Sequence, residues 1–337
     1  MMPKRTFSCH GAFAFAWESL FGRRERRRQR TRLPRARLLF ERLEERTVLT
    51  TFPASPLVVD GAPGSLRYAV LQANAAPGSA MDIIQLEAGT YKLSLPNTNG
   101  QENKGSEGDL DINTNANVLI IQGGGVPGSA NAGPTIIDAQ QVDRAFQIFK
   151  NINNQVVIFK NVTIVGGLAQ DDGIEFRPAG TSDALGGAIL ATDSTINLDH
   201  VIIKNNAAKG AAGAAGVNAP GGDGFHVAGG GVYLEGGAVS LTASYIRRNS
   251  AIGGKGGTGG TIGIQNPDNI APVGGNGVGA RGGGLFAFRA NVTLTTSIIA
   301  LNSAIGGAGG EGGNGNILAN GIGGDGGLGG DGFGGGL

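Results

Sequence analysis

The chain of 337 residues has a single cysteine, Cys9, close to its start. An intrachain disulfide and a cysteine-based metal site are therefore excluded. The sequence has no run of about 18 apolar residues, so we expect no transmembrane helix. It also has no Ser-His-Asp order, no histidine pair at metal-ligand spacing and no phosphate-binding loop. The sequence therefore lacks the common signatures of hydrolases, metalloenzymes and nucleotide-binding proteins.

Positive charge is concentrated at the N-terminus. The formal net charge is +1, but residues 1–50 carry +8 and the remainder carries −7. An acidic body is not expected to bind nucleic acid. We interpret residues 1–56 as a basic, disordered leader or targeting segment, separate from the fold. The alternative is a disordered basic arm that binds nucleic acid or anionic lipid.

Glycine is abundant and unevenly placed, because 43 of the 63 glycines follow residue 200. Ordinary usage is about 7%. A glycine-rich chain loses much conformational entropy when it folds. We therefore expect this part of the chain to be ordered only through a repetitive, stacked structure.

Three gapless copies of one unit begin at Gly187, Gly230 and Gly283, at offsets of 43 and 53 residues, and a divergent copy precedes them by 39. Three columns of the alignment are apolar: Val157, Ile196, Val239 and Val292; Phe159, Leu198, Leu241 and Leu294; Ile164, Ile203, Ile246 and Ile299. The first two columns flank a mostly polar one, and this alternation predicts strands with one buried face. Equal columns at equal phase predict parallel, in-register pairing between copies. The expected fold is all-β, a right-handed parallel β-helix.

An asparagine column, Asn206, Asn249 and Asn302, ends the units. Such a column can carry side-chain hydrogen bonds from coil to coil, and Asn tolerates the left-handed backbone of a sharp corner. The alternative is turn propensity without a ladder.

Three glycine-rich inserts, at about 208–228, 253–281 and 306–332, fall at the same point of successive coils. Their glycines recur with a period of three, which suits a polyproline-II-type helix with three residues per turn. We predict that the inserts stack as a layer of polyglycine-II strands. The alternative is a set of flexible surface loops.

Residues 57–95 are expected to cap the open end of the solenoid. Ser65 is a plausible N-cap for an amphipathic helix that runs to Asn74 and ends at Pro77-Gly78. Strands are expected at Asp82–Leu86 and Gly89–Leu93.

The order of these pieces resembles the right-handed β-helix surface proteins of the choice-of-anchor Q type, relatives of polymorphic outer-membrane-protein repeats. The matching pieces are Gly64–Arg67 with Ala69 and Asn74, Asp82–Ile84, Leu119–Gly123, Thr135–Asp138, Arg144–Phe146, Val162–Ile164 with Gly166-Gly167, and the three repeats. Leu43–Thr50 resembles the LEPR-xLL leader motif of planctomycete surface proteins, with Glu45 in place of the usual proline.

The resemblance covers residues 57–337 and implies an exported, cell-surface scaffold, structural or adhesin-like, without assigned chemistry. Its expected partners are cell-surface glycans or other surface proteins, with no nucleic acid bound by the body and no membrane span. The chain departs from the family in its long glycine inserts and in lacking a C-terminal anchor. The abrupt end at Leu337 suggests truncation.

Enzymes with this fold, such as polysaccharide lyases and glycosidases, place acidic and basic side chains on outward positions of adjacent coils. The best acidic cluster here is Asp171, Asp172, Glu175 and Asp183, with His200 in the following coil. Catalytic use of Asp171, Asp172, Glu175 and His200 is the alternative to a non-catalytic scaffold. A solvated loop is the favoured interpretation.

No cofactor is expected. Gly326–Gly334 fits one copy of a calcium-binding nonapeptide, with Asp325 and Asp331 as candidate ligands, but those residues are spaced by six instead of nine. Calcium binding is therefore disfavoured. A contact face for a partner is expected at Lys204, Tyr245, Arg247 and Arg248. The outward row that contains Tyr245 is partly apolar, and the alternative is that it lies under the glycine inserts.

Overall fold

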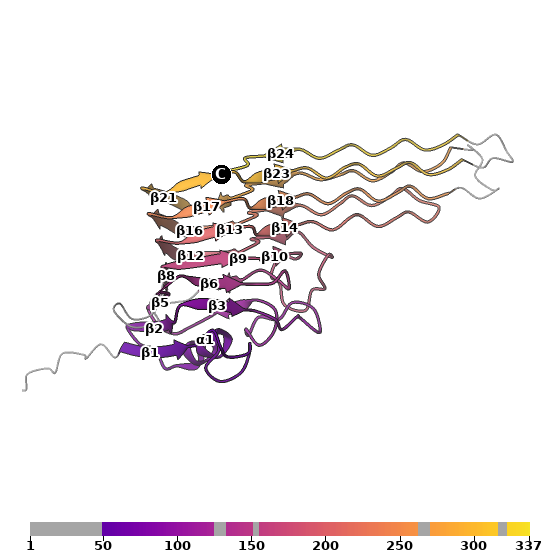
Figure 1. Cartoon of the computed structure of the whole chain (residues 1–337). Helices are drawn as coiled ribbons and strands as arrows, with labels where there is room; N and C mark the ends of the chain where they lie inside the picture. The colour runs from indigo at the N-terminus through magenta and orange to yellow at the C-terminus, as the bar shows by residue number, and fades with distance from the viewer. Residues whose placement is uncertain (1–48, 125–132, 151–154, 262–269, 316–321) are drawn as a thin grey trace, which may run out of the picture. The chain divides into compact units, whose positions relative to one another are not determined.

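The computed structural model describes residues 49–124, 133–150, 155–261, 270–315 and 322–337 (Figure 1). The body from Arg46 to Leu337 forms one compact unit. Most of the predicted basic leader, residues 1–48, lies outside the described residues.

The regular secondary structure of the body is almost entirely β-strand, and the strands form four sheets, which we call A to D. Sheet A contains β1 (Leu49–Ala54), β2 (Met81–Leu86), β4 (Leu110–Ile112), β5 (Val118–Gln122), β7 (Phe146–Ile148), β8 (Val156–Lys160), β12 (Ile189–Asp199), β16 (Val232–Thr242), β20 (Leu285–Phe288) and β21 (Asn291–Thr295). Sheet B contains β3 (Gly89–Lys92), β6 (Thr135–Asp138), β9 (Val162–Val165), β13 (Ile202–Lys204), β17 (Tyr245–Arg247) and β22 (Ile298–Ala300).

Sheets C and D are narrower. Sheet C contains β10 (Leu168–Ala169), β14 (Ala207–Lys209), β18 (Ser250–Ile252) and β23 (Ser303–Ile305). Sheet D contains β11 (Ala184–Leu185), β15 (Val227–Ala228), β19 (Ala280–Arg281) and β24 (Gly332–Phe333). From β12 onward the chain passes from sheet A to B, C and D, and then returns to A one strand further along.

Every described strand pair is parallel, and the repeats pair in the register that the sequence predicts. Ile196 pairs with Val157 on one side and Val239 on the other, and Val239 pairs with Val292. Ile203 pairs in the same way with Ile164 and Ile246. The prediction of an all-β fold with parallel, in-register strands is therefore confirmed.

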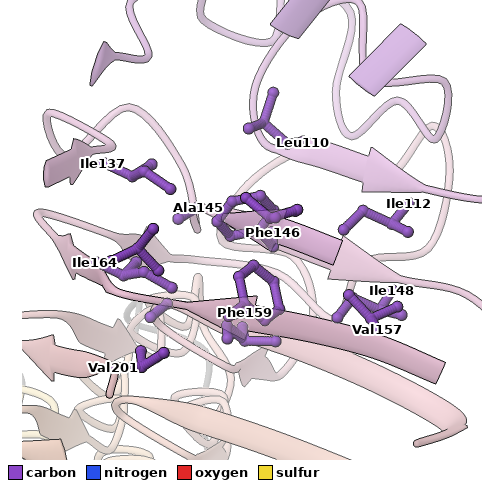
Figure 2. Packing of buried hydrophobic residues seen from close by; sticks show 14 of the residues in the cluster. Leu110, Ile112, Ile137, Ala145, Phe146, Ile148, Val157, Phe159, Ile164 and Val201 are labelled. Carbon is purple, nitrogen blue, oxygen red and sulfur yellow. The ribbon is translucent and has the colours of Figure 1, made fainter. Parts of the chain in front are cut away.

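The core consists of two clusters of buried side chains, a wide one formed by sheets A and B and a narrow one formed by sheets C and D. Aliphatic and aromatic side chains of sheets A and B form the wide cluster, in which Phe146 and Phe159 meet edge to face with ring centroids 5.0 Å apart (Figure 2). Burying a side chain of this size stabilises the fold by roughly 2–3 kcal/mol. Sheets C and D meet over a second cluster made mainly of alanines: Ala169, Ala184, Ala208, Ala251 and Ala280, with Val227. Small side chains let these two sheets approach closely.

The helix α1 (Leu66–Ala75) forms where the sequence predicts one. Ser65 is its N-cap, and its hydroxyl oxygen accepts a hydrogen bond from the Tyr68 N–H at 3.2 Å. The helix packs its buried face against β1, β2 and β4. Arg67 is buried and pairs with Asp60 at 3.0 Å. No helix among the described residues is long and apolar enough to cross a membrane.

The boundary between leader and body differs from the predicted one at residue 56. Leu49–Ala54 forms strand β1 and pairs residue for residue with Met81–Leu86. Ala54 is buried and Phe52 packs against the core. These residues belong to the body because they form the edge strand of sheet A. Their pairing with β2 could not be predicted from local sequence, because β2 is distant in the chain.

The asparagine ladder is present at the corner between sheets B and C. Asn206 Nδ2 donates to Asn249 Oδ1, and Asn249 Nδ2 donates to Asn302 Oδ1, both at 3.0 Å. Asn302 Oδ1 also accepts from the Asn249 backbone N–H at 2.9 Å. The ladder begins where the Gly167 N–H donates to Asn206 Oδ1 at 2.8 Å.

The left-handed residue at this corner is not the asparagine of the ladder, as the sequence suggested, but the residue before it. Asn205, Arg248 and Leu301 have φ of 55°, 55° and 56°. A serine ladder closes the preceding corner in a similar way: the Val201 N–H donates to Ser244 Oγ at 2.9 Å, and the Ser244 N–H donates to Ser297 Oγ at 3.0 Å.

We predict that Asn249→Leu lowers the free energy of unfolding by about 3 kcal/mol, because several buried hydrogen bonds of about 1 kcal/mol each are lost and their partners stay unpaired. Urea denaturation measures the loss. Asn291→Ala, at an exposed position of β21, is the matched control and should change stability little. Equal effects of the two substitutions would contradict the role of the ladder.

Candidate functional site

The four candidate catalytic residues do not share one site, although Asp172 and Glu175 line the same open cavity of about 410 Å³. Asp171 and Asp172 lie in the loop between β10 and β11, whereas His200 follows β12, at the far end of that strand. His200 is exposed, and its Nδ1 lies 2.7 Å from Asp199 Oδ1. The loop leaves sheet C and returns to sheet D, so the whole of β12 separates it from the corner at His200.

Asp171 is a buried counter-ion. It pairs with Arg144, which is fully buried and also donates from Nη1 to Asp109 Oδ2 at 3.2 Å. Asp172 is engaged by Arg177, and its Oδ1 accepts from the Ile174 N–H at 3.2 Å. The contact of Asp171 with Arg144 fixes the loop to the body, whereas the contacts of Asp172 lie within the loop.

The buried cluster around Arg144 holds more carboxyl groups than one arginine neutralises. Burial, followed by the charge of Asp109, raises the pKa of Asp143 to about 8. Burial raises the pKa of Asp109 to about 6, although Arg144 opposes this shift. Burial alone would lower the pKa of Arg144, but the three neighbouring carboxylates raise it on balance. The cluster is therefore a buried ionic network that holds loops together, without access to a substrate.

An open groove of about 260 Å³ follows the outward side of sheets A and D. Its apolar lining includes Leu185, Ala228, Tyr233 and Phe286. Tyr233 and Phe286 come from successive coils and pair in register, and the buried Leu190 packs in the same cluster. The rings of Tyr233 and Phe286 are stacked with centroids 5.7 Å apart. Burial, then the charge of Glu235, raises the pKa of Tyr233 to about 12.

The rim of this groove is polar. Asp183, His226 and Arg281 line it, and the His226 backbone N–H donates to Asp183 Oδ1 at 3.0 Å. An apolar floor with a polar rim suits binding of a sugar face or an apolar side chain. This groove was not predicted from the sequence. The available signal was that Tyr233 and Phe286 align at outward positions, directly after the buried Val232 and Leu285.

The glycine inserts are ordered over their described residues. They span 210–226, 253–279 and 306–331, close to the predicted bounds, and each has a first limb leaving sheet C and a second limb returning to sheet D (Figure 1). Every third residue of a first limb donates to the next insert: Gly210, Gly213 and Gly216 donate to the carbonyls of Ile252, Lys255 and Thr258. Residues 262–269 and 316–321, which belong in sequence to the second and third inserts, lie outside the described residues.

The two limbs are also bonded to each other. Within the first insert, the Gly222 N–H donates to the Ala214 carbonyl oxygen. In the second insert, the Gly257 N–H donates to Gly222 O of the first insert, and the Gly275 N–H donates to Gly257 O. Hydrogen bonds therefore link the limbs both within an insert and between inserts. A methyl group on Gly257 would overlap the carbonyl oxygen of Ala214. Hydrogen bonds in two directions from limbs with a three-residue repeat are the pattern expected for stacked polyglycine-II strands.

The candidate calcium ligands, Asp325 and Asp331, are both exposed and lie on the second limb of the third insert. Six residues at about 3.1 Å each separate them by roughly 19 Å. The described residues contain no group of three or more His, Cys, Asp or Glu side chains placed to hold a metal ion. One ion could not bind both side chains at that separation.

The predicted contact face lies on the outward side of sheet B. Lys204 pairs in register with Arg247, and Tyr245 pairs with Ile202 and Ile298. Arg248 stands at the adjoining corner. The side chain of Tyr245 is 41% exposed and that of Ile298 is 52% exposed, so the glycine inserts do not cover this face.

No protein-family model, no curated protein and no solved structure matches the chain.

We predict that the acidic cluster makes the fold less stable as pH rises. Because the pKa of Asp143 is raised in the folded state, that state keeps a proton which the unfolded chain releases above about pH 4. The stability it provides is lost between about pH 4 and the folded pKa of about 8. Asp143→Asn should therefore reduce the fall in Tm between acidic and alkaline buffer, measured by calorimetry. Asp193→Asn, at an exposed ion pair with Lys150, serves as the control. An unchanged slope in Asp143→Asn would refute this account.

We predict that Gly257→Ala separates the limbs, destabilises the layer by roughly 1–3 kcal/mol, and accelerates amide hydrogen exchange at Gly222 and Gly275. Gly323→Ala is the control, because the nearest atom to a methyl group there is 3.6 Å away. Rapid exchange throughout 253–261 and 270–279 in the unsubstituted chain would show that the inserts are not an ordered layer.

Proposed function

We propose that the body is a right-handed parallel β-helix that serves as an exported, surface-associated scaffold, structural or adhesin-like, without catalytic activity. The observation that carries this proposal is the in-register stacking of four parallel sheets, continued sideways by the hydrogen-bonded glycine layer. Right-handedness is inferred because crossovers between parallel strands are right-handed in about 98% of cases.

The arrangement of the acidic residues supports a non-catalytic role. A glycosidase or lyase needs its acid and base on either side of one sugar bond. Asp171 is instead buried against Arg144, and His200 lies at the other end of β12. The four candidates of the enzyme alternative therefore do not come together as one set among the described residues.

The faces of the stack support a role in binding. Neighbouring strands lie about 4.8 Å apart, so a coil presents its side chains again at that interval. Lys204, Arg247 and Arg248 supply positive charge beside the exposed ring of Tyr245. We propose acidic cell-surface glycans as the ligands of this contact face, since their charges would pair with the cations and their sugar rings would contact the apolar row.

Export is proposed from the resemblance of Leu43–Thr50 to a surface-protein leader. Antibody labelling of intact cells of the source organism, with and without permeabilisation, tests it. Labelling that requires permeabilisation would contradict a surface location.

We predict that Lys204→Glu combined with Arg247→Glu weakens binding to polyanionic polysaccharides by about tenfold or more, since two attractive charges become repulsive. Glycan-array binding at two salt concentrations measures the effect. Lys255→Glu, which reverses one charge on an insert, is the control. Release of cut sugar chains by the unsubstituted protein would favour the enzyme instead, and equal weakening by Lys255→Glu would argue against the contact face.

A further inference from the structure

A concave corner runs along the outside of the stack where the chain passes from sheet D into sheet A. In three successive coils the chain turns there at a glycine with positive φ: Gly186, Gly229 and Gly282, with φ of 67°, 67° and 55°. A methyl group on any of them would overlap a backbone carbonyl oxygen of its own coil. Because the same turn recurs at the same place, the corners of successive coils line up as one groove.

The walls of this groove are outward columns of the two sheets. Leu185, Ala228 and Arg281 pair in register on the sheet D side. Tyr233 and Phe286 pair in register on the sheet A side, and their stacking fixes both rings. The walls enclose the open cavity of about 260 Å³ described above, a volume near the lower end of small-molecule sites.

On the sheet A side the groove begins at Tyr233, because a loop covers the residue before it. Leu190 stands directly before Tyr233 in the same outward column. Gly173 lies so close to Leu190 that a methyl group on Gly173 would overlap the leucine side chain. The pair of Asp171 with Arg144 fixes this loop to the body. This end of the groove is therefore rigid.

Two opposite charges line the groove without forming an ion pair with each other. Asp183 Oδ1 accepts from the His226 backbone N–H at 3.0 Å, while Asp183 Oδ2 has no hydrogen-bond partner among the described residues. The side chain of Arg281 is exposed and has no polar partner in the part of the chain that the structure describes. Arg281 lies two coils after Asp183, so two strand spacings of about 4.8 Å, roughly 10 Å in all, separate them along the stack.

The backbone of the walls leaves no edge for an extended peptide. Strand addition needs unpaired backbone N–H and C=O groups at the edge of a sheet. Here both walls belong to continuous parallel ladders, and the N–H groups of Gly186, Gly229 and Gly282 donate to the next coil. The groove therefore offers side chains only. A sugar is suited to such a surface, because its hydroxyl groups both donate and accept while the C–H groups of its ring are apolar.

We propose that this groove binds a short, uncharged stretch of an oligosaccharide. Its hydroxyl groups donate to Asp183 Oδ2 and accept from the Arg281 guanidinium, while its ring C–H groups contact Tyr233 and Phe286. The carboxylate and the guanidinium balance each other, so a charged sugar attracted by one would be repelled by the other. The site differs in place and chemistry from the contact face on sheet B and does not rest on the binding proposed there.

The test is binding of the full chain to an array of uncharged glucose, mannose, galactose and N-acetylglucosamine oligosaccharides, followed by calorimetric titration with the best binder. We expect at least one of these sugars to bind. Asp183→Asn and Arg281→Ala should each weaken that binding by about tenfold, because each removes a charge-assisted hydrogen bond. Asp183→Asn keeps the oxygen that accepts from His226, and Arg281 has no described partner to lose, so neither variant should change Tm.

Two matched controls lie outside the groove. Asp223→Asn is the control for the carboxylate, because Asp223 Oδ1 likewise accepts a backbone N–H, that of Asn276 at 2.7 Å. Arg289→Ala is the control for the guanidinium, because Arg289 is exposed and its side chain lies over the ring of Phe288. Neither substitution should change sugar binding.

Three results would overturn the proposal. The first is an array on which no uncharged sugar binds. The second is equal weakening by the control substitutions. The third is binding of a blocked, uncharged peptide of alanine and serine in place of every sugar, which would assign the groove to a peptide. Because the probes carry no charge, their failure would leave the proposed binding of acidic glycans to sheet B untouched.

Discussion

Parallel, in-register pairing is the constraint on which the rest of the structure depends. Each strand lies directly on its counterpart in the next coil, so a side chain is always surrounded by its equivalents above and below. An inward position must then be apolar in every coil, and a corner must repeat its hydrogen-bonding group. The asparagine ladder illustrates this, since Asn249 acts as acceptor for one neighbour and donor for the other.

The side chains in the interior become smaller from the core between sheets A and B to the core between sheets C and D, and smaller again in the glycine inserts. Smaller side chains allow the facing backbones to lie closer together. Phenylalanine, leucine and isoleucine separate sheets A and B, alanine separates sheets C and D, and glycine limbs continue outward from C and D. Where no side chain separates the facing limbs, backbone N–H groups can reach carbonyls across the gap as well as in the next layer. Glycine is therefore required in the limbs by the closeness of neighbouring backbones, whereas at turns it is required by φ.

Much of this arrangement could be predicted from the sequence because repetition makes it visible. The columns of Val157, Phe159 and Ile164, the N-cap at Ser65 and the period of three in the inserts all follow from local pattern or alignment. Features that occur once could not be found in this way. The strand β1 pairs with a segment some thirty residues away, and the Arg144 network joins residues from three separate loops. The alignment of the repeats places Tyr233 and Phe286 in one outward column. Periodicity alone does not indicate that outward aromatic residues form a groove.

The limbs of the glycine layer are tied together by hydrogen bonds that run across their length. A pulling force along a limb would therefore load many of these bonds in shear at the same moment. A force that lifts one layer from the next would instead break them one after another. The molecule should consequently resist mechanical tension far better along its inserts than across them, a directional toughness that suits a part exposed to flow or to contact with another surface.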